Sequence, residues 1–201
     1  MTVFPLFENI DNKVFLIVGG GMTAKRKVQK LLTFTSRIIV IAEETDISNV
    51  RVLRKKVDLE DLLLGDFVIA ATDDRARNRE IAEFCKINRI PVNVVDDPEL
   101  CSFIFPSVIK RGDLSVGIST GGASPLYSSH LRKEIEDLLP DHIGGILERM
   151  SALRKAVPSR IKDQKDRAEC YGKILTALLA SDNAADDTEI EAIISSYENG
   201  D

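Results

Sequence analysis

Three small residues at fixed spacing follow an apolar segment near the N-terminus. Gly19, Gly21 and Ala24 match the pattern G-x-G-x-x-A, and residues 14–18 before them are Val-Phe-Leu-Ile-Val. In such a turn the first glycine lets the chain leave a strand sharply, the second lets a pyrophosphate approach the backbone, and the third small residue keeps the next helix near the sheet. We therefore predict a bound dinucleotide. A strand–helix turn without a ligand is the alternative, which a third consecutive glycine disfavours because spare glycines cost stability.

Acidic and amide side chains follow further apolar segments. Glu43 lies 24 residues beyond Gly19, near the usual position of a carboxylate that binds a ribose hydroxyl and repels the 2′-phosphate of NADP. NAD is therefore the predicted cofactor; the alternative for Glu43 is a solvated loop acid. Ligands of open α/β sheets bind beyond the carboxyl ends of the strands, so polar residues at those ends belong to the same candidate pocket. The predicted cofactor-binding residues are Gly19, Gly21, Met22, Thr23, Glu43, Glu44, Thr72, Asp73 and Asn93.

Asp96 is the candidate catalytic residue. It follows the apolar segment 91–95, whose end should face the nicotinamide, and Phe103 and Phe105 are expected to exclude water beside it. A carboxylate in that place can accept a proton as hydride leaves a substrate. The alternative is a turn-forming aspartate in Asp96-Asp97-Pro98, a common role before proline.

The elements that must position these residues alternate between strands and helices. Strands are predicted at 14–18, 37–42, 50–53, 66–72 and 91–95, with helical segments from 24, at 60–64 and at 75–88. This order is typical of an α/β fold with a Rossmann-like doubly wound parallel sheet, here residues 1–105. Residues 102–109 and 114–119 then predict a hairpin, followed by a helix over 125–139 within a small α+β module, 106–140. A helical C-terminal domain, 141–201, is expected to follow, with helix breaks at Pro140 and Pro158.

The second half of the chain contains weaker candidates for substrate binding. Ser119, Thr120 and Gly121 could bind an anion through backbone N–H groups, or serve as a hinge between modules. His142 lies near a predicted helix start and joins them as a candidate substrate-binding residue, whereas His130 is expected on a helix surface. No His, Cys or Asp cluster has metal-ligand spacing, so no permanent metal is predicted.

Composition and charge exclude several classes of function. The net charge is −5 and the pI about 5.2, with no nucleic-acid recognition motif. No apolar run approaches the roughly 20 residues that span a bilayer. The cysteines, Cys85, Cys101 and Cys170, are odd in number and widely spaced, which favours a cytoplasmic location over a disulfide framework.

Charge is unevenly distributed in the C-terminal part of the chain. Residues 149–173 hold eight basic residues against three acids, which fits an anionic substrate or a solvated helix face. Seven acids and no basic residues follow from Asp182 on.

Several ordered motifs together resemble the siroheme synthase N-terminal family, the precorrin-2 dehydrogenases. The resemblance covers residues 1 to about 145. The motifs that carry it are Pro5-Leu6-Phe7, Val18-Gly-Gly-Gly-Met-Thr-Ala-Lys-Arg-Lys27, Ala70-Ala-Thr-Asp-Asp74, Val92-Asn-Val-Val-Asp96, Phe103-Ile-Phe-Pro-Ser107, Ile118-Ser-Thr-Gly-Gly-Ala-Ser-Pro125, Leu131-Arg132 and Leu138-Leu-Pro140.

This resemblance implies NAD-dependent oxidation of precorrin-2 to sirohydrochlorin in siroheme biosynthesis. The family's aspartate, implicated in dehydrogenation and in ferrous iron insertion where that occurs, falls on Asp96. The resemblance also implies a homodimer formed through residues 106–140. The polycarboxylate substrate would give basic residues of the C-terminal domain a purpose, among them Arg149, Arg154, Lys155 and Arg160.

A protein of another class shares the glycine pattern. A non-catalytic NAD-sensing dimeric regulatory domain, such as those that gate potassium transport systems, is the alternative to the enzyme. Residues 119–125 after a hairpin discriminate between the two, because a sensor does not require them.

Overall fold

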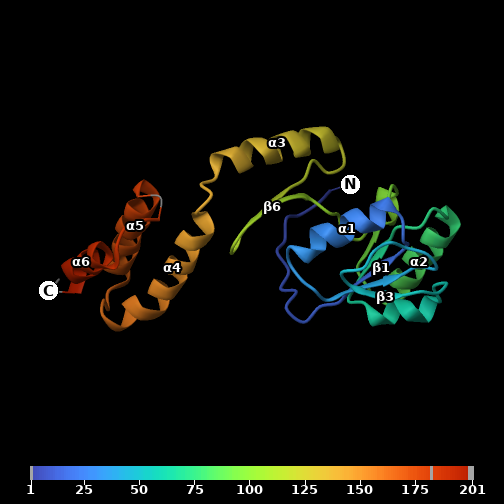
Figure 1. The fold of residues 1–201 in the computed structure, drawn as a ribbon, viewed down its shortest axis with the longest axis horizontal. Coiled ribbons are helices and arrows are strands. Elements are labelled where there is room, and N and C mark those ends of the chain that lie inside the picture. The colour runs from blue at the N-terminus through green and yellow to red at the C-terminus, as the bar shows by residue number, and fades with distance from the viewer. Residues whose placement is uncertain (1, 182, 199–201) are drawn as a thin grey trace. The chain divides into compact units, whose positions relative to one another are not determined.

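The computed structural model describes residues 2–181 and 183–198. The chain forms two compact units (Figure 1). The first comprises the chain up to Pro106 together with Gly121–Ala123, and the second comprises Ser107–Thr120 and the chain from Ser124 on. Most of the segment expected as an α+β module therefore lies in one unit with the segment expected as a helical domain. Asp182 and Asp201, counted above among the C-terminal acids, lie outside the described residues.

The first unit is built on a five-stranded sheet with the order β3-β2-β1-β4-β5, and every pair of neighbours is parallel. The strands are β1 (Phe15–Val18), β2 (Ile38–Ile41), β3 (Arg51–Leu53), β4 (Phe67–Ala70) and β5 (Val92–Val94). Residues of β1 and β2 are buried throughout, as expected for parallel strands that are covered on both faces. The predicted doubly wound α/β fold is thus confirmed. The strand order reverses between β1 and β4, which is where such sheets bind ligands.

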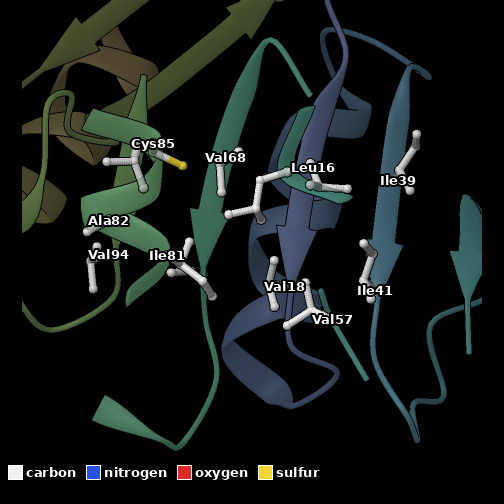
Figure 2. Close-up of a cluster of buried hydrophobic side chains, with 13 residues drawn as sticks. Leu16, Val18, Ile39, Ile41, Val57, Val68, Ile81, Ala82, Cys85 and Val94 are labelled. Atoms are coloured by element: carbon white, nitrogen blue, oxygen red, sulfur yellow. The ribbon is translucent and has the colours of Figure 1, made fainter. Parts of the chain in front are cut away.

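Each face of the sheet has its own apolar core. On one face, Ala24, Val28 and Leu31 of α1 (Met22–Leu32) pack with residues of β1, β2 and β4. On the other, Ile81 and Cys85 of α2 (Arg75–Ile87) pack with residues that include Leu16, Val18, Ile39, Ile41, Val57, Val68, Ala82 and Val94 (Figure 2). Short 3₁₀ helices, η1 (Leu59–Leu64) and η2 (Pro98–Leu100), complete the unit.

The predicted hairpin strand over 102–109 is wrong in its first half. The strand β6 begins only at Ser107 and ends at Arg111. Ser102 ties the preceding segment to β5, because its N–H donates to the carbonyl of Val92 at 2.8 Å and its hydroxyl accepts from the Val92 N–H at 2.7 Å. Phe103 and Phe105 then pack against the core on the α1 side of the sheet. Core packing, together with Pro106, which has no N–H to donate, prevents pairing there.

The second unit begins with an antiparallel hairpin of β6 and β7 (Leu114–Ile118). Its turn needs Gly112, which has φ +54° and approaches Gly144 so closely that a Cβ would lie 2.9 Å from the Gly144 Cα. Helices α3 (Pro125–Leu138), α4 (Ile143–Ala156), α5 (Gln164–Ala180) and α6 (Asp187–Glu198), with the 3₁₀ turn η3 (Val157–Ser159), follow. Pro140 and Pro158 fall at helix breaks, as predicted. None of the helices described is long and apolar enough to cross a membrane.

Candidate functional site

The three consecutive glycines have different surroundings. Gly19 has φ +121°, and a Cβ on it would lie 2.2 Å from the carbonyl oxygen of Ala71. A Cβ on Gly20 would lie 2.2 Å from the carbonyl oxygen of Glu44. Around Gly21, by contrast, no atom lies within 4 Å of the place a Cβ would take. The first two glycines are therefore required by the fold, whereas Gly21 leaves open space at the surface.

That open space adjoins the start of α1. Gly21 is the N-cap residue, no side chain caps the helix, and no acidic residue lies in its first turn. The N–H groups of the first turn are therefore available to an anion, which the helix dipole also favours. Met22 at this end is 64% exposed and Thr23 is half-buried. The arrangement is suited to a pyrophosphate.

The segments after β2 and β4 flank the glycine loop. The Thr45 hydroxyl donates to the carbonyl of Gly20 at 3.0 Å, which fixes the β2 loop beside it. Glu43 and Glu44, both exposed, lie in that loop. The predicted cofactor residues that follow β1, β2 and β4 are thus brought to one edge of the sheet.

The turn after β4 is held by a buried amide. The Thr72 hydroxyl donates to Asn78 Oδ1 at 2.7 Å, and the Asn78 amide donates back to the Thr72 carbonyl at 2.9 Å. Thr72 therefore shapes the pocket rather than offering a free hydroxyl, and Asp73 beside it is exposed. Asp74 caps α2, accepting from the N–H groups of Ala76 and Arg77 at 2.9 and 3.0 Å. Sequence analysis missed Asn78, although its place on the buried face of α2 was a signal.

Asp96 occupies a left-handed turn after β5. Its φ is +60° and its side chain is exposed. Aspartate is one of the few non-glycine residues that adopt this conformation readily. The backbone of Asp96 therefore forms a turn, as the alternative interpretation of this residue expected. The same turn presents the Asp96 carboxylate at the carboxyl edge of the sheet.

Asn93, predicted to bind the cofactor, is buried inside the protein. Its amide donates to the carbonyl of Phe103 at 3.0 Å and contacts Cys101 Sγ at 3.5 Å. Its Oδ1 accepts from Lys27 Nζ at 3.4 Å. Asn93 is therefore placed to position its neighbours. Phe103 and Phe105 are the aromatic residues expected to exclude water beside Asp96. Phe103 packs edge-on against Phe67 in the core, and Phe105 lies under the Lys27 ammonium.

The weaker candidates belong mostly to the second unit. The Thr120 hydroxyl accepts from the Ser124 N–H at 3.1 Å and donates to the Ser124 carbonyl at 3.2 Å. Ser124 in turn caps α3. Gly121, with φ +63°, is grouped with the first unit, and Ser119 with the second. His142 begins α4 as its N-cap residue, and His130 is exposed beside Glu134. The loop 119–124 thus has a clear local role as the start of α3.

Two of the basic C-terminal residues are paired with acids of α6. Arg149 lies 3.2 Å from Asp187, and Arg160 bonds to both Glu191 and Glu198. These ion pairs hold the pKa values of Glu191 and Glu198 below their usual range. Arg149 and Arg160 therefore have an intramolecular role, and their binding of an anionic substrate stays a prediction from the sequence.

Replacing Arg160 by glutamine is expected to lower the Tm modestly and to leave the affinity for an anionic substrate unchanged. The effect is small because the pairs are exposed to solvent. Since the carboxylate pKa values are lowered, this stabilisation is present above the ordinary glutamate pKa and is lost as the pH falls through the lowered values. Thermal melts of both proteins at neutral and acid pH should differ at neutral pH and converge in acid. A higher KM for the substrate in the variant would show instead that Arg160 binds the substrate.

The cysteine thiols are affected by burial. Burial raises the pKa of the Cys85 thiol to about 12 and raises those of Cys101 and Cys170, so all three cysteines are poor nucleophiles. Within residues 2–181 and 183–198, no group of three or more His, Cys, Asp or Glu side chains is arranged to hold a metal ion.

Two protein-family models match this chain. The family model described as putative NAD(P)-binding matches residues 6–107. A second model, described as sirohaem biosynthesis protein central, matches residues 111–138. The first match falls on the parallel sheet with its glycine loop, and the second falls on β7 and α3.

Curated relatives and a solved structure point the same way. The siroheme synthase of Thioalkalivibrio sulfidiphilus is 37% identical over 87% of this chain and 37% of its own length. That of Methylococcus capsulatus is 37% identical over 94% of this chain and 42% of its own length. The chain thus spans about two fifths of these relatives. The structure of the precorrin-2 dehydrogenase SirC is similar with a TM-score of 0.68 and 25% identity, covering 98% of this chain and 100% of that one.

The family model for NAD(P) binding accounts for half of the chain, and siroheme synthases align with most of it. The glycine loop, the uncapped helix start and the strand order are the physical counterparts of that match. The chain therefore belongs to the siroheme synthase N-terminal family and contains its NAD(P)-binding domain.

Proposed function

We propose that the chain catalyses the NAD-dependent oxidation of precorrin-2 to sirohydrochlorin in siroheme biosynthesis. One observation carries the proposal: an uncapped helix start with open space at Gly21 lies at the same sheet edge as the exposed carboxylate of Asp96. The first is suited to a pyrophosphate and the second to proton transfer. The similarity to SirC over all of its length supports the same reaction.

Each residue then has a definite task. The first turn of α1 binds the pyrophosphate, and Glu43 accepts a hydrogen bond from a ribose hydroxyl, which favours NAD over NADP. The nicotinamide supplies the hydride acceptor. Because the macrocycle loses a hydride and a proton in this two-electron oxidation, a base is needed beside it, and Asp96 is that base.

The test is to mix the purified protein with anaerobically generated precorrin-2 and NAD and to record the visible spectrum. Sirohydrochlorin that forms only when NAD is present would support the enzyme. An unchanged spectrum with NAD binding intact by calorimetry would instead favour the NAD-sensing regulatory domain. The cytoplasmic location expected from the sequence stays a prediction.

Ferrous iron is a further proposed substrate of the same site. Inserting it into sirohydrochlorin requires a base for the two pyrrole N–H protons, and Asp96 would serve again. Adding ferrous iron after the oxidation is complete should convert the sirohydrochlorin spectrum to that of siroheme. A rate equal to that without protein would reject this activity.

We also infer a homodimer, supported by the exposed apolar residues of α3. Leu126 is 86% exposed and Leu138 is 81% exposed, which is costly for a monomer in water. Replacing both by glutamate is expected to convert the dimer to a monomer, as measured by light scattering after gel filtration. Replacing the exposed Ile87 of the first unit by glutamate is the control, and it should leave the mass unchanged. A wild-type protein that elutes as a monomer would refute the inference.

A further inference from the structure

We propose that Lys27 binds a carboxylate side chain of the substrate, an inference that rests on the proposed function and deepens it. Lys27 lies on α1, and nothing above gives it a role in the reaction or in cofactor binding. Its surroundings are those of a cation that lacks an anion.

The Lys27 ammonium contacts an aromatic ring and an amide oxygen, and neither contact is with a carboxylate. It lies 4.0 Å from the centre of the Phe105 ring, a cation–π contact, and 3.4 Å from the neutral amide oxygen of Asn93. Within the residues described, no acid lies at ion-pair distance from it. An ammonium has three N–H donors, so at least one remains for a ligand.

The amide that contacts this ammonium is held in place. Asn93 cannot turn away, because its amide donates to the Phe103 carbonyl and its residue is only 6% exposed. Lys30, one helical turn along α1, donates to the carbonyl of Pro106 and lies 6.0 Å from the same Phe105 ring. Two cations therefore lie near one aromatic ring, and this favours an incoming anion.

The electrostatics agree with the geometry. Burial and the neighbouring Lys30 lower the pKa of Lys27 to about 8, against smaller raising effects of Cys101 and Asp96. The ammonium form is thus costly in the absence of an anion, and a bound carboxylate would stabilise it. Asp96 is among the groups that act on Lys27, which places the lysine within electrostatic reach of the proposed base. The substrate of the proposed reaction is a polycarboxylate, so it offers the required group.

The test is an equilibrium titration of sirohydrochlorin, which has the carboxylates of the substrate and requires no turnover. Lys27→Met is expected to raise its Kd about tenfold or more, the usual effect of losing one charge-assisted hydrogen bond. Lys27→Arg should stay within about threefold of wild type, because the charge is kept. Arg26→Met, an exposed change of the same charge on the same helix, is the control and should have no effect. The Kd for NAD reports that each variant is folded.

A pH series adds a readout that a merely structural lysine would not give. Below its pKa Lys27 is charged and binds, so the wild-type affinity should fall as the pH rises from about 7 to about 9.5, while ordinary lysines stay charged. The Lys27→Arg variant should show no such fall. An unchanged Kd for sirohydrochlorin in Lys27→Met, or an equal loss of NAD affinity, would overturn the inference. Failure of the wild-type protein to oxidise precorrin-2 would instead refute the proposed function, which this titration does not measure.

Discussion

Replacing Asp96 by asparagine is expected to lower kcat by about 10²- to 10⁴-fold, the usual contribution of a general base, and to leave the Kd for NAD unchanged. Asparagine has the same shape and also tolerates the left-handed φ of +60° that this position requires. The backbone turn is therefore kept and only the proton acceptor is lost. Alanine would be a poorer test, since it also strains the turn.

The matched control is Asp97→Asn, which removes the same charge from the adjacent residue of the same loop. Its kcat should stay within about twofold of wild type, as is usual for a change outside the reacting groups. Steady-state kinetics of both variants, with NAD binding by calorimetry, would decide the matter. If Asp96→Asn keeps full activity, Asp96 is not the base and the proposed mechanism is wrong.

Replacing Gly21 by alanine is expected to weaken NAD binding by at least about tenfold without lowering the Tm by more than a degree or two. In the free protein the new Cβ would meet no atom within 4 Å, so the fold has no reason to change. With a pyrophosphate bound, the same methyl group would lie between the backbone and the phosphates. The loss would therefore appear in the Kd alone.

The contrasting variant is Gly19→Ala. Its φ of +121° is unfavourable for alanine, and its Cβ would lie 2.2 Å from the Ala71 carbonyl oxygen, so β1 and β4 would have to separate. We expect a large fall in Tm or no folded protein. Thermal melts and NAD titrations of the two variants would contradict this account if Gly21→Ala unfolded the protein, or if Gly19→Ala were as stable as wild type.

Local patterns in the sequence were sufficient to predict the sheet and the glycine loop. The apolar segments of β1, β2 and β4 are continuous because both faces of the sheet are covered, and the glycine spacing follows directly from the turn that it forms. The different structural roles of Gly19, Gly20 and Gly21 could be predicted only in part. The contact of Gly20 with the loop after β2 depends on how distant segments pack.

The same reason explains the side-chain contacts that could not be predicted from the sequence. Lys27 and Asn93 are 66 positions apart, and Arg160 meets Glu198 across 38 positions. Such contacts leave no local periodicity, so Lys27 was one of several helix lysines and Arg160 one member of a basic stretch. The segment 102–106 was misassigned for a related reason, since its alternating aromatic residues serve the core on the α1 side and not a hairpin.

The proposed function depends on hydride transfer from precorrin-2 to NAD at this site. The most direct measurement is to quantify NADH and sirohydrochlorin together during an anaerobic reaction of wild-type protein with precorrin-2 and NAD. The two products should form in equal amounts and at equal rates, and both rates should fall together in Asp96→Asn. Sirohydrochlorin that forms without NADH, or NAD that binds while precorrin-2 is left unchanged, would contradict hydride transfer at this site.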